Sequence, residues 1–250
     1  MGKCRLGVQL WSVREDCAAN LEATLEGVAK MGYEGVELAG LHGRAAAEWV
    51  KLLKGNGLLA PSAHSGLDTL MPEKLQATMD TYAEMGCKNL IIGGLGWEHM
   101  KSVDGLKRAA ELLNQAAAAA AKAGFRLGFH NHDSEFRPVE GVLPFDVLAQ
   151  NLGPKLLLEM DLGWICHAGE DPVKWLKKYP GRSAFVHVKA HSSKSKTAVL
   201  GEDEVDWPRV LQACVEFGAT KWLVVEHEEY ANPPMVCIQQ CIAYMKTVMP

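Results

Sequence analysis

Apolar runs of four to seven residues recur along the chain, and most of them follow a glycine. Short apolar runs between turn signals are typical of buried strands. The runs are spaced by roughly thirty residues, the length of one strand, one helix and their loops. The eight runs are Arg5–Trp11, Gly35–Leu38, Leu58–His64, Asn89–Gly93, Phe125–His130, Lys155–Asp161, Ser183–Lys189 and Lys221–Glu226.

Helix-forming segments lie between these runs, and five of them begin with proline, which is favoured in the first turn of a helix. The expected helices are Leu21–Met31 with Asn20 as its N-cap, Pro72–Met85, Val103–Ala123, Pro144–Asn151, Pro172–Tyr179, Pro208–Phe217 and Pro233–Val248. A glycine in a left-handed C-cap is a common link from a helix to a strand. We expect this role for Gly32, Gly57, Gly86, Gly124, Gly153, Gly181 and Gly218.

The alternation of strands and helices predicts a parallel sheet. Eight units without a linker favour a closed (β/α)8 TIM barrel, an α/β fold, as a single domain over residues 1–250. An open doubly wound sheet is the competing fold. No Gly-x-Gly-x-x-Gly motif follows the first run, so the sequence lacks the dinucleotide-binding mark of that alternative.

Composition narrows the class of protein. The chain has 250 residues, of which 48% are hydrophobic and 22% charged, with a net charge of −4. This charge argues against a nucleic-acid partner, and no apolar stretch has the length of a membrane span. Seven scattered cysteines without a CxxC pair, and a start that leads directly into an apolar run, predict free thiols, no signal peptide and a cytoplasmic location.

Four consecutive runs late in the chain end on side chains that bind metals. These are His130, Asp161, His187 and Glu226. In a TIM barrel the active site lies at the carboxyl ends of the strands, so we expect the four side chains to converge. A mixed nitrogen and oxygen set suits Mn²⁺, Fe²⁺, Co²⁺ or Zn²⁺. The sequence therefore predicts one divalent metal ion with these four ligands.

Residues two apart on a strand face the same side. Glu159 should therefore lie one layer below Asp161, while Lys189 shares the side of His187. A buried carboxylate needs a partner. Lys189 or a ligand histidine is the expected partner of Glu159, in a structural ion pair or in support of the metal site.

Polar and aromatic residues near other strand ends are candidates for binding a substrate. We assign this role to His64, His132, Gln9, Trp11 and Trp164. His132 shares the side of His130, so either histidine could bind metal while the other binds substrate or transfers protons. The alternative roles are structural: a hydrogen-bonded histidine at position 64, and core packing for the tryptophans. Glu135 and Ser192–Lys196 are expected on loops, solvated or folded back towards the site.

Several phrases together resemble the sugar phosphate isomerase/epimerase family, the xylose-isomerase-like TIM barrels, over essentially the whole chain. The phrases are residues 7–14 (GVQLWSVR), 32–38 (GYEGVEL), 62–64 (SAH), 129–132 (FHNH), 160–164 (MDLGW), 168–172 (AGEDP), 187–189 (HVK) and 225–226 (VE). The resemblance implies one divalent metal, often manganese, on strands five to eight, commonly held by Glu, Asp, His and Glu. Asp161, His187 and Glu226 match the last three positions, whereas His130 replaces the first glutamate and resembles a His-Asn-His subgroup.

The resemblance implies a divalent-metal-dependent isomerase or epimerase that abstracts a proton next to a carbonyl of a sugar or polyol derivative. In the ketose epimerases of this family two metal-bound glutamates shuttle the proton, and only Glu226 remains here. Glu226 is the expected base, with His130, His132 or Lys189 as the second acid/base. Ala190 is a further departure, because the subgroup often has aspartate there.

Three other functions are compatible with the sequence. A lyase or dehydratase, similar to inosose dehydratase or to a 3-keto-glycoside lyase, could use the same metal site on a keto-sugar. An apurinic endonuclease or a non-catalytic sugar-binding barrel would share the fold. The expected partner is a small sugar or keto-sugar of carbohydrate metabolism. Manganese is the first expectation for the metal, with zinc, cobalt, iron or magnesium as alternatives. The protein could also form a homo-oligomer.

Overall fold

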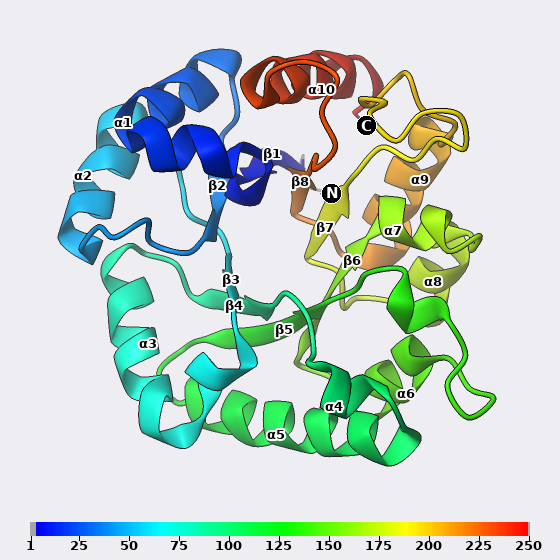
Figure 1. The fold of residues 1–250 in the computed structure, drawn as a ribbon. Coiled ribbons are helices and arrows are strands. Elements are labelled where there is room, and N and C mark those ends of the chain that lie inside the picture. Colours follow the sequence, from blue (N-terminus) through cyan, green and yellow to red (C-terminus); the bar gives the residue numbers. More distant parts are fainter. Residues whose placement is uncertain (1–3, 250) are drawn as a thin grey trace.

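The computed structural model describes residues 4–249, and its centre is a closed barrel of eight parallel strands (Figure 1). Each strand pairs with the next along the chain, and β8 pairs back with β1. The strands are β1 (Arg5–Gln9), β2 (Gly35–Ala39), β3 (Ala63–Ser65), β4 (Asn89–Ile92), β5 (Arg126–His130), β6 (Leu157–Asp161), β7 (Phe185–Val188) and β8 (Trp222–Val225). The predicted (β/α)8 barrel is confirmed. The domain was expected to span residues 1–250. Residues 1–3, at the start of the chain, and residue 250 lie outside the described residues.

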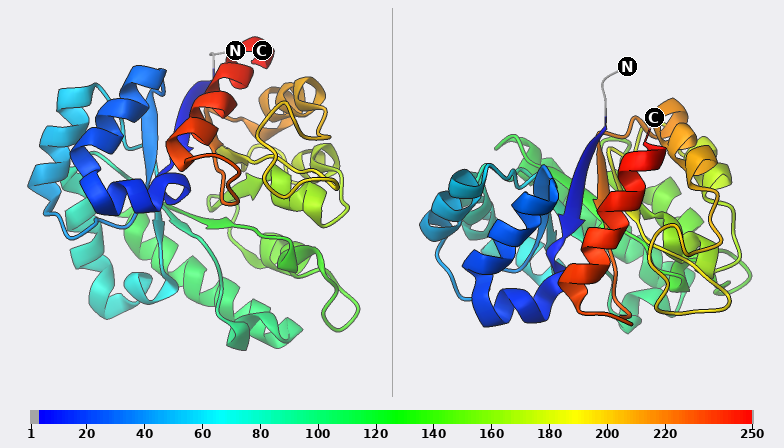
Figure 2. Two further views of the ribbon diagram at one scale, coloured as in Figure 1. Left: turned by 45° about the horizontal axis from the view of Figure 1, so that its top comes forward. Right: turned by 90° about the horizontal axis from the view of Figure 1, so that it is seen from above.

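Helices surround the barrel in chain order, and the last of them packs beside the first (Figures 1 and 2). They are α1 (Arg14–Met31), α2 (Ala46–Asn56), α3 (Pro72–Glu84), α4 (Trp97–Met100), α5 (Val103–Ala121), α6 (Pro144–Asn151), α7 (Leu162–His167), α8 (Pro172–Lys178), α9 (Trp207–Ala213) and α10 (Pro234–Val248). None of these described helices is long and apolar enough to cross a membrane.

The barrel interior changes from apolar to polar along the strands. A small inner cluster, which includes Ile91, Leu157, Phe185 and Trp222, fills the amino-terminal half. Gly35 makes room for this layer, since a Cβ atom there would lie 2.9 Å from the Trp222 ring. Polar side chains follow towards the carboxyl ends of the strands, where function resides in barrels of this type.

The third strand is shorter than predicted. The run Leu58–His64 was expected to be a strand, but regular pairing covers only Ala63–Ser65. Leu59 forms an isolated bridge to Gly35. Pro61 lies between these two pairings and has no N–H to donate to a neighbouring strand, which explains the interruption.

The glycine C-caps are correct at five of the seven expected positions, where φ is positive. Gly153 and Gly218 do not adopt this conformation. After α9 the chain continues through a single π-helical turn, Cys214–Gly218, and Ala219 takes the left-handed conformation with φ 54°. The wider turn moves the left-handed position one residue past the glycine.

Helix α1 begins before the predicted start, at Arg14, but it is broken at Asn20, where φ is −159°. The Asn20 side chain accepts a hydrogen bond from the amide of Ala23 at 3.0 Å. The predicted N-cap is therefore present as a kink within a longer helix. Helices α2, α4 and α7 were not predicted.

Candidate metal and active site

The four predicted ligands lie together at the carboxyl end of the barrel. His130, Asp161, His187 and Glu226 each offer one ligand atom, and these atoms lie within 4.8 Å of one another. His187 Nδ1 is 3.4 Å from Glu226 Oε2 and 3.8 Å from Asp161 Oδ2. All four side chains are buried, and we call this set the ligand cluster.

Three buried side-chain atoms of the ligand cluster lack a hydrogen-bond partner among residues 4–249. They are His130 Nδ1 and, facing each other, Asp161 Oδ2 and His187 Nδ1. A buried polar group without a partner costs about 1–3 kcal/mol. A divalent cation between Asp161 Oδ2 and His187 Nδ1 would satisfy both, and the two nitrogen and two oxygen donors suit the metals of the manganese-to-zinc series. The residues therefore fit a single metal ion.

Glu37, in the middle of β2, fixes the orientation of His187. Glu37 Oε1 accepts hydrogen bonds from Gln9 Nε2 at 2.6 Å and from His187 Nε2 at 2.7 Å. Its other oxygen accepts from Ser62 Oγ at 2.5 Å. Because His187 donates through Nε2 to this carboxylate, Nδ1 is the ring nitrogen that faces the cluster, as in carboxylate–histidine–metal arrangements.

Hydrogen bonds to the side chain and to the backbone of Asp161 fix the position of its ligand oxygen, Oδ2. Its Oδ1 accepts from the amide of Trp164 at 2.7 Å and thereby caps α7. The side chain of Asn131 pairs with the amide of Asp161 at 3.1 Å and with its carbonyl oxygen at 3.3 Å. These contacts connect the ends of β5 and β6 and leave Oδ2 to the cluster.

Glu159 lies below the ligand cluster and contacts its histidines. Glu159 Oε2 is 2.8 Å from His64 Nε2, 3.3 Å from His187 Nε2 and 3.5 Å from His130 Nδ1. Of its two expected partners, ligand histidines are present, but Lys189 is not. Lys189 instead pairs with Glu226 at 3.4 Å and with Glu228.

His64, a predicted substrate-binding residue, lies directly beside the ligand cluster. Its ring centre lies 4.9 Å from that of His130, and its Nε2 is 3.2 Å from Glu37 Oε1. His64, His130, Glu159 and His187 form a second set whose ligand atoms lie within 4.8 Å of one another. The side chain of His64 is 20% exposed, so it still reaches the barrel mouth.

Burial and neighbouring charges give the cluster residues different protonation states. Burial raises the pKa of Asp161 to about 8. Burial opposes the charge of Glu226 too, but Lys189 and His187 hold the pKa of Glu226 well below its usual range. Burial, with His187 nearby, holds the pKa of His130 well below its usual range. Glu226 is therefore an anion and His130 a neutral donor at neutral pH.

A pocket of about 490 Å³ lies over the ligand cluster, and we call it the metal-side pocket. His130 and Glu226 line it, together with His64, His132 and Trp11 of the predicted substrate-binding residues. Trp11 lies in a 3-10 helix (Leu10–Val13) that follows β1, instead of on the strand itself.

Gln9 and Trp164 are placed differently from the other predicted substrate-binding residues. Gln9 is fully buried, and its two side-chain groups bond to Glu37 and to the amide of Trp11. Trp164 lies on α7 and lines a second pocket of about 670 Å³, which we call the outer pocket. Gln9 therefore supports Glu37, and Trp164 belongs to a neighbouring space.

The structure assigns roles to some residues at the barrel mouth that the sequence did not indicate. Glu135 is buried and accepts hydrogen bonds from the amide of His132 at 2.8 Å and from Ser134, so it shapes its own loop. Arg14 and Glu228 line the outer pocket. For Glu37 the sequence carried a signal, a charged residue inside the apolar run of residues 35–38, but its partner on β7 could not be inferred from that run.

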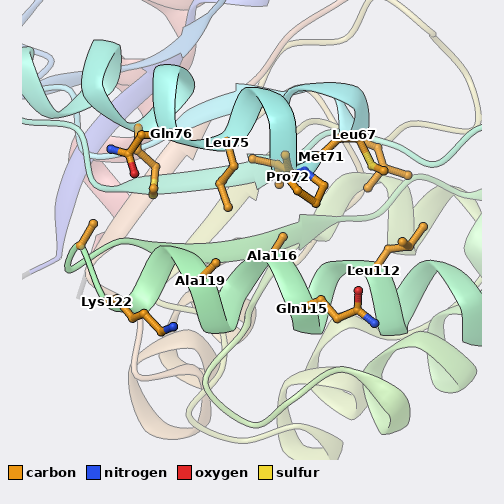
Figure 3. A pocket seen from close by; sticks show the side chains of 13 residues that line it. Leu67, Met71, Pro72, Leu75, Gln76, Leu112, Gln115, Ala116, Ala119 and Lys122 are labelled. Atoms are coloured by element: carbon orange, nitrogen blue, oxygen red, sulfur yellow. The ribbon is translucent and has the colours of Figure 1, made fainter.

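A groove of about 700 Å³ lies elsewhere, between α3 and α5 on the outside of the barrel (Figure 3). Its walls are largely apolar and include Leu75, Leu112 and Ala116. Neither of the potential metal-binding sets found in residues 4–249 lies there. The barrel mouth is therefore the candidate active site.

Comparison with known proteins agrees with this architecture. Residues 25–247 match the family model described as xylose isomerase-like TIM barrel. An inosose dehydratase from Geobacillus kaustophilus (strain HTA426) is 25% identical, with 83% of this chain and 80% of that protein covered.

Solved structures share the fold at low sequence identity. A sugar phosphate isomerase/epimerase from Parabacteroides distasonis ATCC 8503 has a TM-score of 0.86 at 24% identity, with 98% of each chain covered. The IolI protein with a bound zinc atom has a TM-score of 0.79 at 16% identity, with 98% of this chain and 97% of that chain covered. The same fold thus occurs in a protein that holds a metal.

Proposed function

Because the chain belongs to the xylose isomerase-like TIM barrel family, we propose that it is a divalent-metal-dependent isomerase or epimerase of a sugar or polyol derivative. Relatives with this fold include an isomerase/epimerase, a D-psicose 3-epimerase and a dehydratase. The observation that carries the proposal is the pair of unpartnered, buried atoms, Asp161 Oδ2 and His187 Nδ1, between His130 and Glu226. We expect the metal to be manganese.

The chemistry begins with proton abstraction next to a carbonyl. A bound divalent cation would polarise the carbonyl and its adjacent hydroxyl and so acidify the hydrogen between them. Glu226 is the base, because it lines the metal-side pocket and Lys189 keeps it ionised. His132 lines the same pocket, and burial lowers its pKa, so it is neutral and able to accept or return a proton.

Elimination is the second candidate, for a specific reason. The ligand cluster contains one glutamate, so a shuttle between two ligand glutamates has no second member. In a lyase or dehydratase Glu226 would remove the proton and Lys189, which lies 3.4 Å from it, would protonate the leaving group. The similarity to an inosose dehydratase supports this alternative.

Product analysis separates the two reactions. The metal-loaded protein is incubated in D₂O with a panel of keto-sugars and keto-polyols, and products are followed by NMR and mass spectrometry. Isomerisation conserves the atoms of the substrate and introduces solvent deuterium, whereas elimination removes water or another leaving group. If deuterium enters no member of the panel and no product forms, the proposed function is wrong.

The metal site has its own test. Asp161→Ala and His187→Ala each remove a ligand, so we expect the purified variants to lose their bound metal in elemental analysis. Asp80→Ala is the matched control, because Asp80 is an exposed carboxylate on α3. Full metal content in both ligand variants would exclude the proposed site.

A further inference from the structure

We infer that the active site accepts a substrate of two linked units: a keto-sugar ring in the metal-side pocket, and a second hydroxylated ring in the outer pocket. The inference rests on the proposed function and extends it to a substrate class. It starts from the observation that the barrel mouth contains two adjoining pockets, of about 490 and 670 Å³.

The two pockets meet along a shared wall. Glu228 lines both of them, and its ion pair with Lys189 lies at the boundary. Arg14 lines the outer pocket and Trp11 the metal-side pocket, with the Arg14 guanidinium 4.9 Å from the Trp11 ring centre. A substrate that spans this wall would have its first unit at the ligand cluster and its second between α7 and the loops after β7 and β8.

The volumes support two units. Pockets for small molecules typically measure about 300–1,000 Å³, and each of the two lies within this range on its own. The metal-side pocket therefore suffices for one sugar ring. The outer pocket is the larger of the two, yet it contains none of the four ligand residues, so it is available for a part of the substrate that does not react.

The lining of the outer pocket indicates the chemistry of the second unit. Trp164, His167 and His191 form a row of aromatic rings, with neighbouring ring centres 5.3 and 5.5 Å apart. Aromatic rings offer flat apolar contact surface to a sugar ring. Hydroxyl groups of Ser192 and Ser195 add donors and acceptors for the hydroxyls of such a ring.

The charges that line the outer pocket have mixed sign. Glu228 and Glu229 line it, and so do the cations Arg14, Lys189 and Lys196. Lys189 is paired with Glu228, and Arg14 donates to the carbonyl oxygen of Trp11 and to the hydroxyl of Tyr230. A hydroxylated ring can use both signs of charge as hydrogen-bond partners.

The wall formed by the loop after β7 is anchored. The amide of His191 donates to Asp203 at 3.3 Å, and the carbonyl of His191 accepts from the amide of Glu204 at 3.1 Å. Further along, Val199 and Leu200 are buried. This loop, yellow in Figure 1, lies near α9 and α10, and these hydrogen bonds fix its position at the wall of the outer pocket.

The test compares one keto-sugar ring with and without a second ring. The probes are the methyl glycoside of the keto-hexose that exchanges fastest in the panel, and the keto-disaccharide that contains the same ring. Solvent deuterium uptake next to the carbonyl gives kcat/KM for isomerisation of both probes, and formation of the unsaturated product gives it for elimination. We expect kcat/KM to be roughly tenfold higher for the keto-disaccharide, because the second ring adds contacts in the outer pocket.

Two variants on one loop provide the contrast. Ser195→Trp places a large side chain in the outer pocket and should remove most of the tenfold preference while leaving the methyl glycoside rate within about twofold. Lys194→Trp is the matched control, because the Lys194 side chain is 87% exposed and does not line the pocket. His191→Ala, which removes part of the aromatic wall, replaces Ser195→Trp if that variant fails to fold.

The outcomes separate the two proposals. Equal kcat/KM for both probes, or an equal loss for both in Ser195→Trp with Lys194→Trp unaffected, would overturn the two-unit substrate and leave the proposed function standing. An absence of both exchange and elimination product with every probe would overturn both. A selective loss for the keto-disaccharide in Ser195→Trp supports the inference.

Discussion

Glu37 shows how one buried side chain sets the chemistry of its neighbours. It is fully buried, and His64 and His187 hold its pKa well below the usual range although burial opposes this. Gln9 and Ser62 complete its hydrogen bonds. It touches no substrate in our proposal, and its role is to hold His187 with Nδ1 towards the metal.

Glu37→Gln tests this positioning role. The amide has similar size but only one accepting oxygen, so the hydrogen bonds that hold His187 are disturbed, and metal affinity should fall about 10–100-fold. Competition with a chelator measures the affinity directly. Glu34→Gln is the control, since Glu34 is partly exposed beside β2 and pairs with Arg5. Unchanged affinity in Glu37→Gln would contradict the assignment.

The raised pKa of Asp161 predicts a pH dependence of metal binding. Without a cation its carboxyl has a pKa of about 8, so below pH 8 a proton must leave before the metal binds. Metal affinity should therefore fall as pH falls, by about tenfold per unit for each released proton. The contribution of Asp161 ends above pH 8, whereas the neighbouring carboxylates, against the effect of burial, hold the pKa of His187 well above its usual range, so release of its proton adds to the slope. Chelator competition between pH 6 and pH 9 measures the slope, and a flat profile would show that Asp161 is not a ligand.

At the residue scale the sequence predicted the ligand cluster and the contact of Glu159 with its histidines, and it missed the support from Glu37. Strand-end position was enough to bring His130, Asp161, His187 and Glu226 together, because parallel strands carry their carboxyl ends to one face. The hydrogen bond from His187 to Glu37 could not be predicted, because it crosses the barrel and depends on the register of both strands. The same holds for the contact of His64 with Glu159.

At the element scale, strands and most helices could be predicted because apolar runs and prolines mark them. Strand β3 is shorter than predicted because Pro61, inside the apolar run, interrupts the pairing. Helix α2 escaped prediction because it begins after Ala45, which lacks a capping side chain of its own. Helix α7 escaped because Asp161 was interpreted as a ligand only, whereas it also caps that helix.

The turn between α9 and β8 offers a test of local strain. Ala219 is exposed and has φ 54°, a conformation that costs a residue with a Cβ about 1 kcal/mol or more. Ala219→Gly should therefore raise the free energy of unfolding by about 1 kcal/mol, measured by urea denaturation. Ala118→Gly, at an exposed position within α5, should lower it by about 1 kcal/mol. Destabilisation by both substitutions would contradict the strain at Ala219.

At the scale of the whole molecule, the ligand cluster connects four neighbouring strands of the barrel, β5 to β8. A metal that binds only the folded state stabilises it by mass action, by about 2.7 kcal/mol at a concentration of one hundred times its Kd. For a chain of this size that corresponds to roughly 5–10 °C in Tm. Metal removal with a chelator should lower Tm by this amount in the unaltered protein.

The Asp161→Ala variant is the control for that measurement. It lacks one ligand, so addition of metal or chelator should leave its Tm nearly unchanged. An equal shift in the variant would mean that the stabilising metal binds elsewhere.

The contact between Glu37 and His187 spans 150 residues of sequence and has a consequence for biosynthesis. A ribosome releases β2 long before β7, and Glu226 emerges later still, so no chain shorter than 226 residues contains a complete ligand cluster. The extensive apolar core does not include the ligand cluster and can close the barrel first. Under the proposed function, the ion would then be acquired through the finished mouth, and a cell short of metal would accumulate a folded, inactive barrel instead of an unfolded chain.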